Sequence, residues 1–265
     1  MLTAASRGGV VEGLVPHLID GGLSHLQYAD DTIIFLKDNE TNYENLKFLL
    51  LCYESMSGMK INYNKSEVFA IGIEQVEIDR IAAVFGCKVG AFPINYLGLP
   101  VSDRKLSKNQ LSFVEQKVTN RLRSWKCDTL SSGDKAILLQ SCLSSIPLYT
   151  MDVYLLCEGN YQQLDTLRSR FFWQGTGKKK KYHMVKWEAL SRPKESGGLG
   201  FMAVRAMNVC LLSKWIDKLE RGDESMCCEL LRKKYLGQKI IFQIKTRSGS
   251  QFWRGLLEAR EWFKA

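Results

Sequence analysis

Alternation of apolar and polar residues dominates the first hundred positions of the chain. It is clearest over 24–35, SHLQYADDTIIF, where two short apolar runs flank a pair of aspartates. This pattern predicts two strands joined by a turn. Extended structure is also expected over 60–72, and a turn followed by a strand over 92–101, where prolines bound the apolar run. Residues 1–23 are expected to form a loop or an incomplete element.

Two helices interrupt these extended segments. From Thr41 onwards apolar residues recur at helical spacing, and Gly58 suits the position that follows the last turn of a helix. A second, shorter helix is predicted over about 74–85, before Gly86. The apolar face expected for the first helix consists of Tyr43, Leu46, Leu49, Tyr53 and Met56.

Beyond residue 106 the helical period takes over. Ser107 and Gln110 form the pattern of a capping box. Further helices are predicted near 133–145 and at 160–173, and another follows the GGLG segment 197–200, which we interpret as a flexible joint. The expected core stripes are Leu111, Val114, Val118, Leu122 and Trp125; Leu164, Leu167 and Phe171; and Met207, Leu211, Trp215 and Leu219. The fold class that follows is α+β, mixed up to about residue 100 and mostly helical beyond it.

Charge divides the chain at the same place. Residues 1–100 carry 7 Lys and Arg against 12 Asp and Glu, a net charge of −5, whereas residues 101–265 carry 30 against 16, a net charge of +14. A polyanionic partner fits the second part. An ordinary solvated basic surface would have the same composition, so the charge alone does not decide between them.

Several classes of protein fit the sequence poorly. The first residues lack the basic stretch and apolar run of a signal peptide, so secretion is not expected. The longest uncharged run, 136–151, has sixteen residues and contains a proline, which is too short and too polar to span a bilayer. The eight cysteines include no CxxC pair, which argues against a zinc site or a disulfide framework and favours reduced, buried thiols in an intracellular protein.

The aspartate pair, Asp30 and Asp31, allows two interpretations. The first is a polar hairpin turn without further chemistry. The second is nucleotidyl transfer, which uses two divalent ions about 4 Å apart, held by carboxylate oxygens on a rigid turn. Neighbouring strand residues point to opposite faces, so the two carboxylates share one site only at a turn or bulge. Such a site also needs a third carboxylate from another strand.

Basic and aromatic residues are interleaved over 168–194. This segment holds nine Lys and Arg against the single Glu188, and the aromatic residues Phe172, Trp173, Tyr182 and Trp187 are interleaved with them. Cations contact phosphates and flat rings stack on unpaired bases, which predicts binding of RNA or a primer–template duplex. A surface loop with core-facing tryptophans, or a nuclear-import signal at the four consecutive lysines, are the alternatives. The nine cations are Arg168, Arg170, Lys178, Lys179, Lys180, Lys181, Lys186, Arg192 and Lys194.

Characteristic blocks of sequence follow one another along the chain. LQYADDTIIF (26–35), GMKINYNKS (58–66) and YLGLPV (96–101) lie in the first part, and the basic stretch 168–201 with its W-x-G … W … PK-x-x-GGLG pattern lies in the second. LLSKW, LRKKYLG and FWRGL continue the series to about residue 257. In order and spacing these blocks resemble the reverse transcriptase of plant LINE-type non-LTR retrotransposons, and 122–151 is similar to its thumb.

The resemblance implies roles for individual residues. Asp30 would be the main metal ligand and Asp31 its neighbour, and together they would be the catalytic pair. The residues that it places near the primer or the incoming nucleotide are Tyr28, Ala29, Lys65, Tyr96, Leu97 and Gly98. Judged from the residues alone, Lys65 is equally well a solvated strand lysine and Tyr96 a packing residue.

The resemblance also implies an organisation. Residues 1–105 would be the C-terminal part of a reverse-transcriptase palm (a β-hairpin plus helix), 106–158 a helical thumb and 159–265 a basic helical extension. In the family the strand with the first catalytic aspartate precedes the YADD hairpin by many more residues than are present here. We therefore expect the metal site to be incomplete in this chain.

The implied function is RNA-directed DNA synthesis. Its partners would be an RNA template and a DNA primer, with Mg²⁺ or Mn²⁺ and no small molecule other than deoxynucleotides, no membrane, and a nuclear or otherwise cytoplasmic location. Two alternatives stay open: a catalytically inactive nucleic-acid-binding remnant, and a domesticated helical interaction protein.

Overall fold

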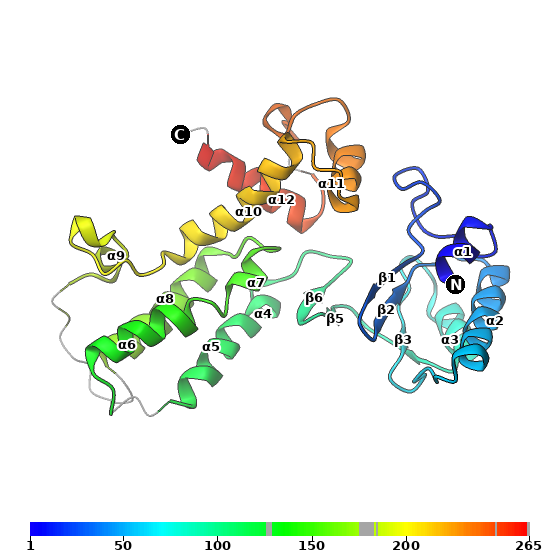
Figure 1. Cartoon of the computed structure of the whole chain (residues 1–265), viewed down its shortest axis with the longest axis horizontal. Coiled ribbons are helices and arrows are strands. Elements are labelled where there is room, and N and C mark those ends of the chain that lie inside the picture. Colours follow the sequence, from blue (N-terminus) through cyan, green and yellow to red (C-terminus); the bar gives the residue numbers. More distant parts are fainter. Residues whose placement is uncertain (126–128, 175–182, 184, 247, 264–265) are drawn as a thin grey trace. The chain divides into compact units, whose positions relative to one another are not determined.

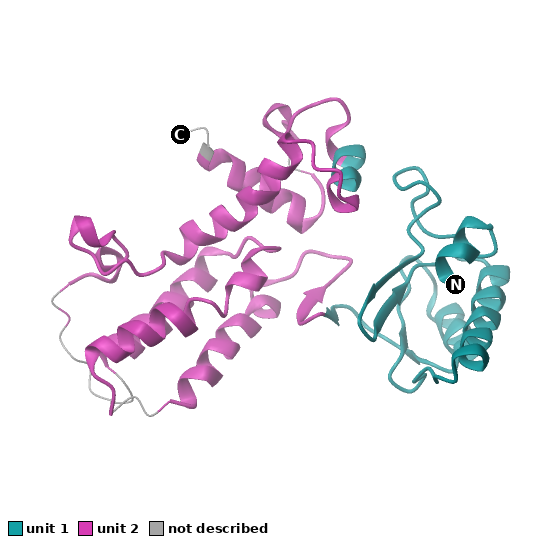
Figure 2. Ribbon diagram, in the orientation of Figure 1, with its two compact units in different colours: residues 1–96, 229–234 teal, residues 97–228, 235–265 magenta. Residues whose placement is uncertain are grey.

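The computed structural model describes residues 1–125, 129–174, 183, 185–246 and 248–263. It confirms the α+β fold class, with small two-stranded sheets in the first part and helices beyond (Figure 1). The chain divides into two compact units, coloured separately in Figure 2: unit 1 comprises 1–96 and 229–234, and unit 2 comprises 97–228 and 235–265. This division does not test the functional domains inferred above, which stay predictions.

Unit 1 contains the YADD hairpin and two helices. Strand β1 (His25–Tyr28) pairs antiparallel with β2 (Asp31–Ile34), in the place where two strands were predicted. Helix α2 ends before Gly58 and α3 ends before Gly86, and both glycines have the left-handed conformation expected after a last turn. The remaining elements are α1 (Leu2–Arg7), α2 (Glu40–Ser57), β3 (Glu67–Val68), α3 (Gln75–Phe85), β4 (Lys88–Val89), which pairs parallel with β3, and β5 (Ile94–Tyr96).

Unit 1 differs from the expectations in three places. Residues 2–7 form helix α1 where a loop or an incomplete element was expected, because Leu2 packs against the apolar cluster of unit 1 and Ala5 is buried. On α2 the apolar face is buried only in its first half. Met56, expected in the core, is 83% exposed, because the packed residues of α2 extend only as far as Leu50. Extended structure over 60–72 is limited to the two residues of β3.

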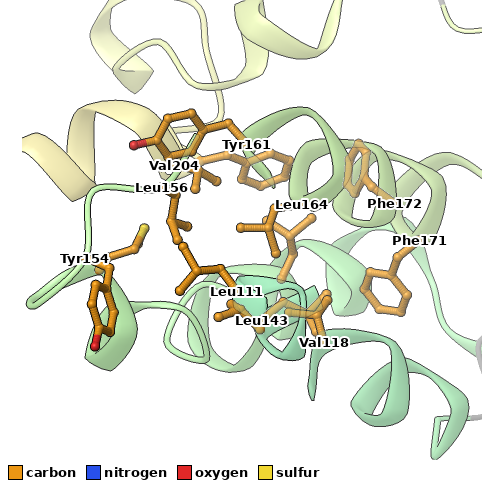
Figure 3. Close-up of a cluster of buried hydrophobic side chains, with 14 of the residues drawn as sticks. Leu111, Val118, Leu143, Tyr154, Leu156, Tyr161, Leu164, Phe171, Phe172 and Val204 are labelled. Carbon is orange, nitrogen blue, oxygen red and sulfur yellow. The ribbon is translucent and has the colours of Figure 1, made fainter. Parts of the chain in front are cut away.

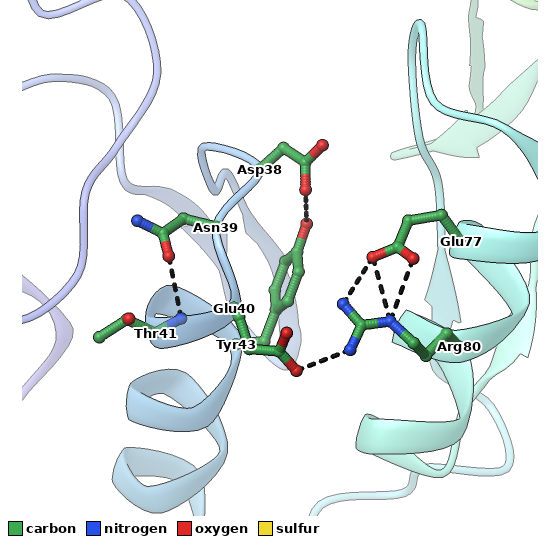
Figure 4. Close-up of polar contacts among 7 residues, drawn as sticks. All are labelled: Asp38, Asn39, Glu40, Thr41, Tyr43, Glu77 and Arg80. Carbon is green, nitrogen blue, oxygen red and sulfur yellow. Dashed lines mark hydrogen bonds and ion pairs between the residues drawn. The ribbon is translucent and has the colours of Figure 1, made fainter.

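The core of unit 1 joins α2 to α3. It consists of Tyr43, Leu46, Ile81 and Phe85, and the rings of Tyr43 and Phe85 meet edge to face at 6.3 Å. Polar contacts hold the same two helices together at the surface (Figure 4). There the Arg80 guanidinium donates to Glu77 on its own helix and to Glu40 on α2, both at 2.6 Å.

Unit 2 is mostly helical. Its predicted capping box at Ser107 and Gln110 is present, and a second one forms at Ser131 and Asp134. Residues 139–143 continue α6 as a π-helical turn. Strand β6 (Leu99–Val101) pairs with β5. The helices are α4 (Lys108–Leu111), α5 (Phe113–Arg123), α6 (Ser132–Leu138), α7 (Leu148–Met151), α8 (Glu158–Trp173), α9 (Trp187–Leu190), α10 (Val204–Glu220), α11 (Met226–Leu231) and α12 (Gln251–Arg260). Helix α11 spans the boundary with unit 1.

A continuous apolar cluster runs through unit 2 from Leu106 to Val204 (Figure 3). Two predicted stripes are confirmed: Val114 and Val118 on α5 are buried, as are Leu164 and Phe171 on α8. Trp125 packs against this cluster with its ring 5.3 Å from that of Phe171, so it is a packing residue, as its helical spacing predicts.

Helix α10 is turned relative to the predicted stripe. Its most buried face contains Val204, Asn208, Leu212 and Ile216, whereas Met207 and Leu211 lie at the flank. Of the predicted stripe, Leu219 is buried as expected. The cause of the rotation is the buried amide of Asn208, which donates to the carbonyls of Met151 at 2.7 Å and Tyr154 at 3.0 Å. It also accepts from the Leu156 backbone N–H and the Tyr161 hydroxyl. A polar residue that satisfies four hydrogen bonds therefore lies where the pattern predicted a solvent face.

The GGLG segment is a tight turn, which corrects our interpretation of it as a flexible joint. The backbone N–H groups of Leu199 and Phe201 donate to the Leu190 carbonyl, at 3.0 and 3.2 Å, and that of Gly200 donates to Arg192. A Cβ atom at Gly198 would overlap the carbonyl oxygen of Arg192, so only glycine fits there. None of the helices among the described residues is both long and apolar enough to cross a bilayer.

Candidate functional site

The YADD hairpin turns through a two-residue loop. Tyr28 pairs with Asp31, so Ala29 and Asp30 form the loop between β1 and β2. Ala29 has a φ of 49°, in the left-handed region that glycine usually occupies in such turns. An alanine there is strained, and residues held in strained conformations cluster at functional sites. The strain therefore directs attention to the tip of this hairpin.

The two carboxylates at this tip face solvent. Asp30, Asp31 and Tyr28 are exposed, and 64% of the Tyr28 surface is accessible. Among the described residues, neither aspartate side chain accepts a hydrogen bond or forms an ion pair. The turn places both aspartates next to each other without neutralising either, which leaves their oxygens available to a hard cation such as Mg²⁺.

The pair does not complete a two-metal site. Two metal ions need more carboxylate oxygens than two aspartates supply. Within the described ranges no group of three or more His, Cys, Asp or Glu side chains is arranged to hold a metal ion. The residues present therefore fit part of such a centre, and no catalytic step follows from them alone.

A second hairpin carries the other predicted primer contacts. Leu97 and Gly98 form the two-residue loop between β5 and β6, with φ angles of 50° and 80°. Positive φ at both positions is the geometry of a type I′ turn, so Leu97 is strained in the same way as Ala29. Tyr96 is half-buried and Gly98 is exposed.

Lys65 lies in a turn rather than in a strand. Its backbone N–H donates to the carbonyl of Asn62 at 3.0 Å and to the Asn62 side chain at 3.2 Å, and its own side chain is exposed. No hydrogen bond or ion pair of a described residue joins Lys65 to Asp30 or Asp31. Its assignment to the nucleotide therefore stays a prediction.

Arg168 requires a correction, because it is not a surface cation. The residue is 1% exposed, and its guanidinium donates to Asp165 at 2.9 Å and to the Met202 carbonyl at 2.8 Å. Burial lowers the pKa of Arg168, and the adjacent Asp165 opposes that shift. Since the residue is buried and its two terminal guanidinium nitrogens are bonded inside the core, Arg168 is unavailable to phosphates and has a structural role. Its Nε is buried without a hydrogen-bond partner among the described residues.

The other predicted cations fall into two groups, those that the structure describes and those outside the described residues. Arg170, Lys186, Arg192 and Lys194 are exposed and available to an anionic partner. Lys178, Lys179, Lys180 and Lys181 lie outside the described residues.

The aromatic residues of this segment pack inward where they are described. Phe172 is buried against Trp187 and Phe201, with ring centroids 6.4 and 5.2 Å away. The Trp187 indole N–H donates to Asp165 at 3.1 Å. These rings match the alternative of core-facing aromatics, so binding by this segment would depend on its cations. Tyr182 lies outside the described residues.

Sequence reasoning missed a cavity of about 630 Å³ in unit 2. Residues from four separate segments line it, including Lys105, Lys108, Arg205, Arg254 and Trp262. No linear motif joins these positions, so only the fold brings them together. The one available signal was the overall excess of positive charge beyond residue 100.

Comparison with known proteins finds two relatives from Arabidopsis thaliana. A protein named "Putative ribonuclease H protein" is 34% identical over 161 residues, which are 60% of this chain and 26% of the relative. An "Uncharacterized mitochondrial protein" is 26% identical over 119 residues, which are 44% of this chain and 77% of that protein. The chain thus spans about a quarter of the first relative. No protein-family model matches it.

Proposed function

We propose that this chain is a nucleic-acid-binding part of the reverse transcriptase of a plant LINE-type non-LTR retrotransposon. The observation that carries the proposal is the YADD hairpin, whose strained tip holds Asp30 in the loop and Asp31 at the start of β2, side by side and unneutralised. The order of the other sequence blocks supports it. So do the two plant relatives, one of which has a ribonuclease H name and therefore belongs with proteins that act on nucleic acid.

In the whole polymerase the hairpin would contribute to nucleotidyl transfer. Asp30 would ligate Mg²⁺ or Mn²⁺ with Asp31 beside it, and the bound ions would activate the primer hydroxyl and hold the triphosphate of a deoxynucleotide. An RNA template and a DNA primer would be the partners, and the nucleus the place of action. Because the described chain brings no third carboxylate to the pair, we propose that it does not polymerise by itself.

Primer extension tests the catalytic part of the proposal. With an RNA template, an annealed DNA primer, deoxynucleotides and Mg²⁺, the chain should give no extension. Incorporation that disappears in Asp30→Asn would contradict this expectation, because another carboxylate would then have to complete the site. A commercial polymerase on the same template serves as the positive control.

A salt titration tests the binding part. If about five cations of 168–194 neutralise phosphates, the logarithm of the affinity should fall against the logarithm of the salt concentration with a slope of roughly −3.5 on single strands and −4.5 on duplex DNA. Replacement of Lys178, Lys179, Lys180 and Lys181 by alanine should flatten that slope by about three and weaken all sequences alike.

Two outcomes would redirect the proposal. An unchanged slope in the quadruple variant, together with its relocation in cells, would assign the four lysines to nuclear import. Absence of binding by the unaltered chain at low salt would remove the nucleic-acid role and favour an interaction protein. The catalytically inactive, nucleic-acid-binding remnant is the second candidate, and the lack of a third carboxylate among the described residues favours it.

A further inference from the structure

The cavity of unit 2 has the size of a ligand site. It holds about 630 Å³, and it is lined by the segment that leads into α4, the start of α8, helices α10 and α12, and the turn after α12. Pockets that bind small molecules typically have volumes of roughly 300–1,000 Å³. None of the residues that suggested polymerase chemistry lies in it.

The charges around the cavity are unbalanced. Four cations line it, against the carboxylates of Glu158 and Glu258. Arg205 is paired with Glu158 at 3.3 Å. Lys105, Lys108 and Arg254 have no carboxylate of a described residue within 4.0 Å. Cations gathered around one cavity repel each other, and an anion between them would remove that repulsion.

Glycine at position 159 lets one of these cations reach the cavity wall. A Cβ atom there would lie 2.5 Å from the Lys108 ammonium nitrogen and 2.8 Å from its Cε. The Lys108 side chain therefore lies against the backbone of Gly159, at a place that any other residue would fill. Lys108 lines the cavity where α4 meets α8, as do Glu158 and Asn160, the two neighbours of Gly159 in the chain.

The other walls offer apolar and flat surfaces. Leu106, Leu111 and Leu257 line the cavity with buried side chains, whereas the indole of Trp262 is 52% exposed. The Arg205 guanidinium lies 5.5 Å from the centroid of that indole. A cavity lined by a flat ring and by unpaired cations suits a ligand with both an aromatic ring and phosphate groups.

We propose that this cavity binds a nucleoside phosphate, either as a free nucleotide or as an unpaired nucleotide of a single strand. The base stacks on Trp262, and the phosphate lies between Lys105, Lys108 and Arg254. The single-strand form deepens the proposed nucleic-acid function and rests on it. The contacts themselves are independent of the YADD hairpin and of the basic segment 168–194.

Calorimetry with the full chain and defined ligands tests the cavity directly. Adenosine 5′-monophosphate and an adenylate 10-mer are titrated, with adenosine and inorganic phosphate as the two halves of the ligand. Trp262→Ala should weaken binding of whichever of these two ligands the chain binds by about 5- to 150-fold, which is the range of one base–aromatic stack. Trp262→Phe should restore most of the lost affinity. Adenosine and phosphate alone should each bind at least about tenfold more weakly than the intact ligand.

A charge-matched pair of triple variants tests the cations. Lys105→Gln, Lys108→Gln and Arg254→Gln together should remove binding of the monophosphate and flatten the salt slope of the 10-mer by about two. Lys117→Gln, Arg123→Gln and Lys239→Gln lose the same charge from exposed sites of unit 2 outside the cavity, and should leave monophosphate binding unchanged. Thermal melts of every variant verify folding.

The outcomes separate the two proposals. Binding of the monophosphate that depends on Trp262 supports a free nucleotide, and dependence seen only with the 10-mer supports a strand. If the Trp262→Ala and cavity triple variants bind both ligands like the unaltered chain, or if phosphate alone binds as tightly as the monophosphate, the cavity proposal is wrong. In that case 10-mer binding that still depends on Lys178 to Lys181 would leave the proposed function intact.

Discussion

Unit 2 contains a large continuous apolar cluster, in which Leu139, Leu143 and Met151 have no accessible surface. The cluster of unit 1 has four buried residues, and large apolar side chains such as Phe48 and Met56 remain exposed on α2. The stability of a fold depends on the apolar area that it removes from water. The unit with the recognisable aspartate hairpin is therefore the one with the smaller core of its own.

The polar side chains of the two units also differ in burial. In unit 2 the buried Arg168 and Asn208 donate to backbone carbonyls inside the core. In unit 1 the corresponding network around Arg80 lies at the surface, with 46% of that side chain exposed. Buried polar networks are rigid and sensitive to loss of one partner, whereas exposed ones contribute little. The comparison suggests four measurements.

The largest difference is expected between the two arginines. Arg168→Ala should lower the free energy of unfolding of unit 2 by about 3 kcal/mol, because it leaves Asp165 and the Met202 carbonyl without their buried donor. Arg80→Ala in unit 1 should cost at most about 1 kcal/mol. Chemical denaturation, with hydrogen exchange to assign the change to a unit, measures both. Arg170→Ala, an exposed change on the same helix as Arg168, is the control, and equal losses for Arg168 and Arg170 would refute the buried role.

A smaller difference is expected between two aromatic side chains. A buried Trp→Ala change costs about 3–5 kcal/mol, and the half-buried Trp125 should therefore cost about 2–3 kcal/mol. Phe48→Ala, on the exposed face of α2, should change stability by no more than about 0.5 kcal/mol. Thermal melts and RNA binding are measured together. If Trp125→Ala leaves the melt unchanged but weakens RNA binding, its assignment to the core is wrong.

Relief of strain should stabilise the hairpin of unit 1. Ala29→Gly removes the Cβ penalty of a left-handed residue but adds freedom to the unfolded chain, so the net gain should be about 0.5–1 kcal/mol. Ala70→Gly, at a position of unit 1 with ordinary φ, should instead destabilise by a similar amount. Amide exchange across β1 and β2 reports the result. Faster exchange in Ala29→Gly would show that the alanine is not strained.

The smallest effect is a dependence on pH. The hydrogen bond from Arg80, followed by its charge, holds the pKa of Glu40 below the ordinary 4.5. A carboxyl whose pKa is lower in the folded state stabilises the fold above its ordinary pKa, and that contribution is lost as the pH falls through the folded value. Unit 1 should therefore weaken slightly below about pH 4.5, and Glu40→Gln should remove that part of the decline. Denaturation midpoints between pH 3 and 6 test this, and identical profiles would contradict it.

Local patterns were reliable wherever one residue decides the local structure. Gly58 and Gly86 end their helices as predicted, because a left-handed residue without a Cβ atom stops a helix whatever surrounds it. The YADD hairpin and the capping box at Ser107 were predicted for the same reason, since their hydrogen bonds join neighbours in sequence. The likeness that suggests a polymerase also lies in such short segments.

Burial was decided by the tertiary structure alone. Arg168 and Asn208 look like surface residues in the sequence, and they lie in the core because distant backbone carbonyls, of Met202 and Met151, accept their hydrogen bonds. Met56 looks like a core residue and is exposed because the packed part of α2 ends before it. Four cations that are up to 149 residues apart in sequence, from Lys105 to Arg254, meet around one cavity only when α4, α8, α10 and α12 pack together. Sequence periodicity tells which residues share a face of one helix or strand. What packs against that face depends on contacts between segments far apart in the chain, and those contacts set the dielectric and the charge around each side chain.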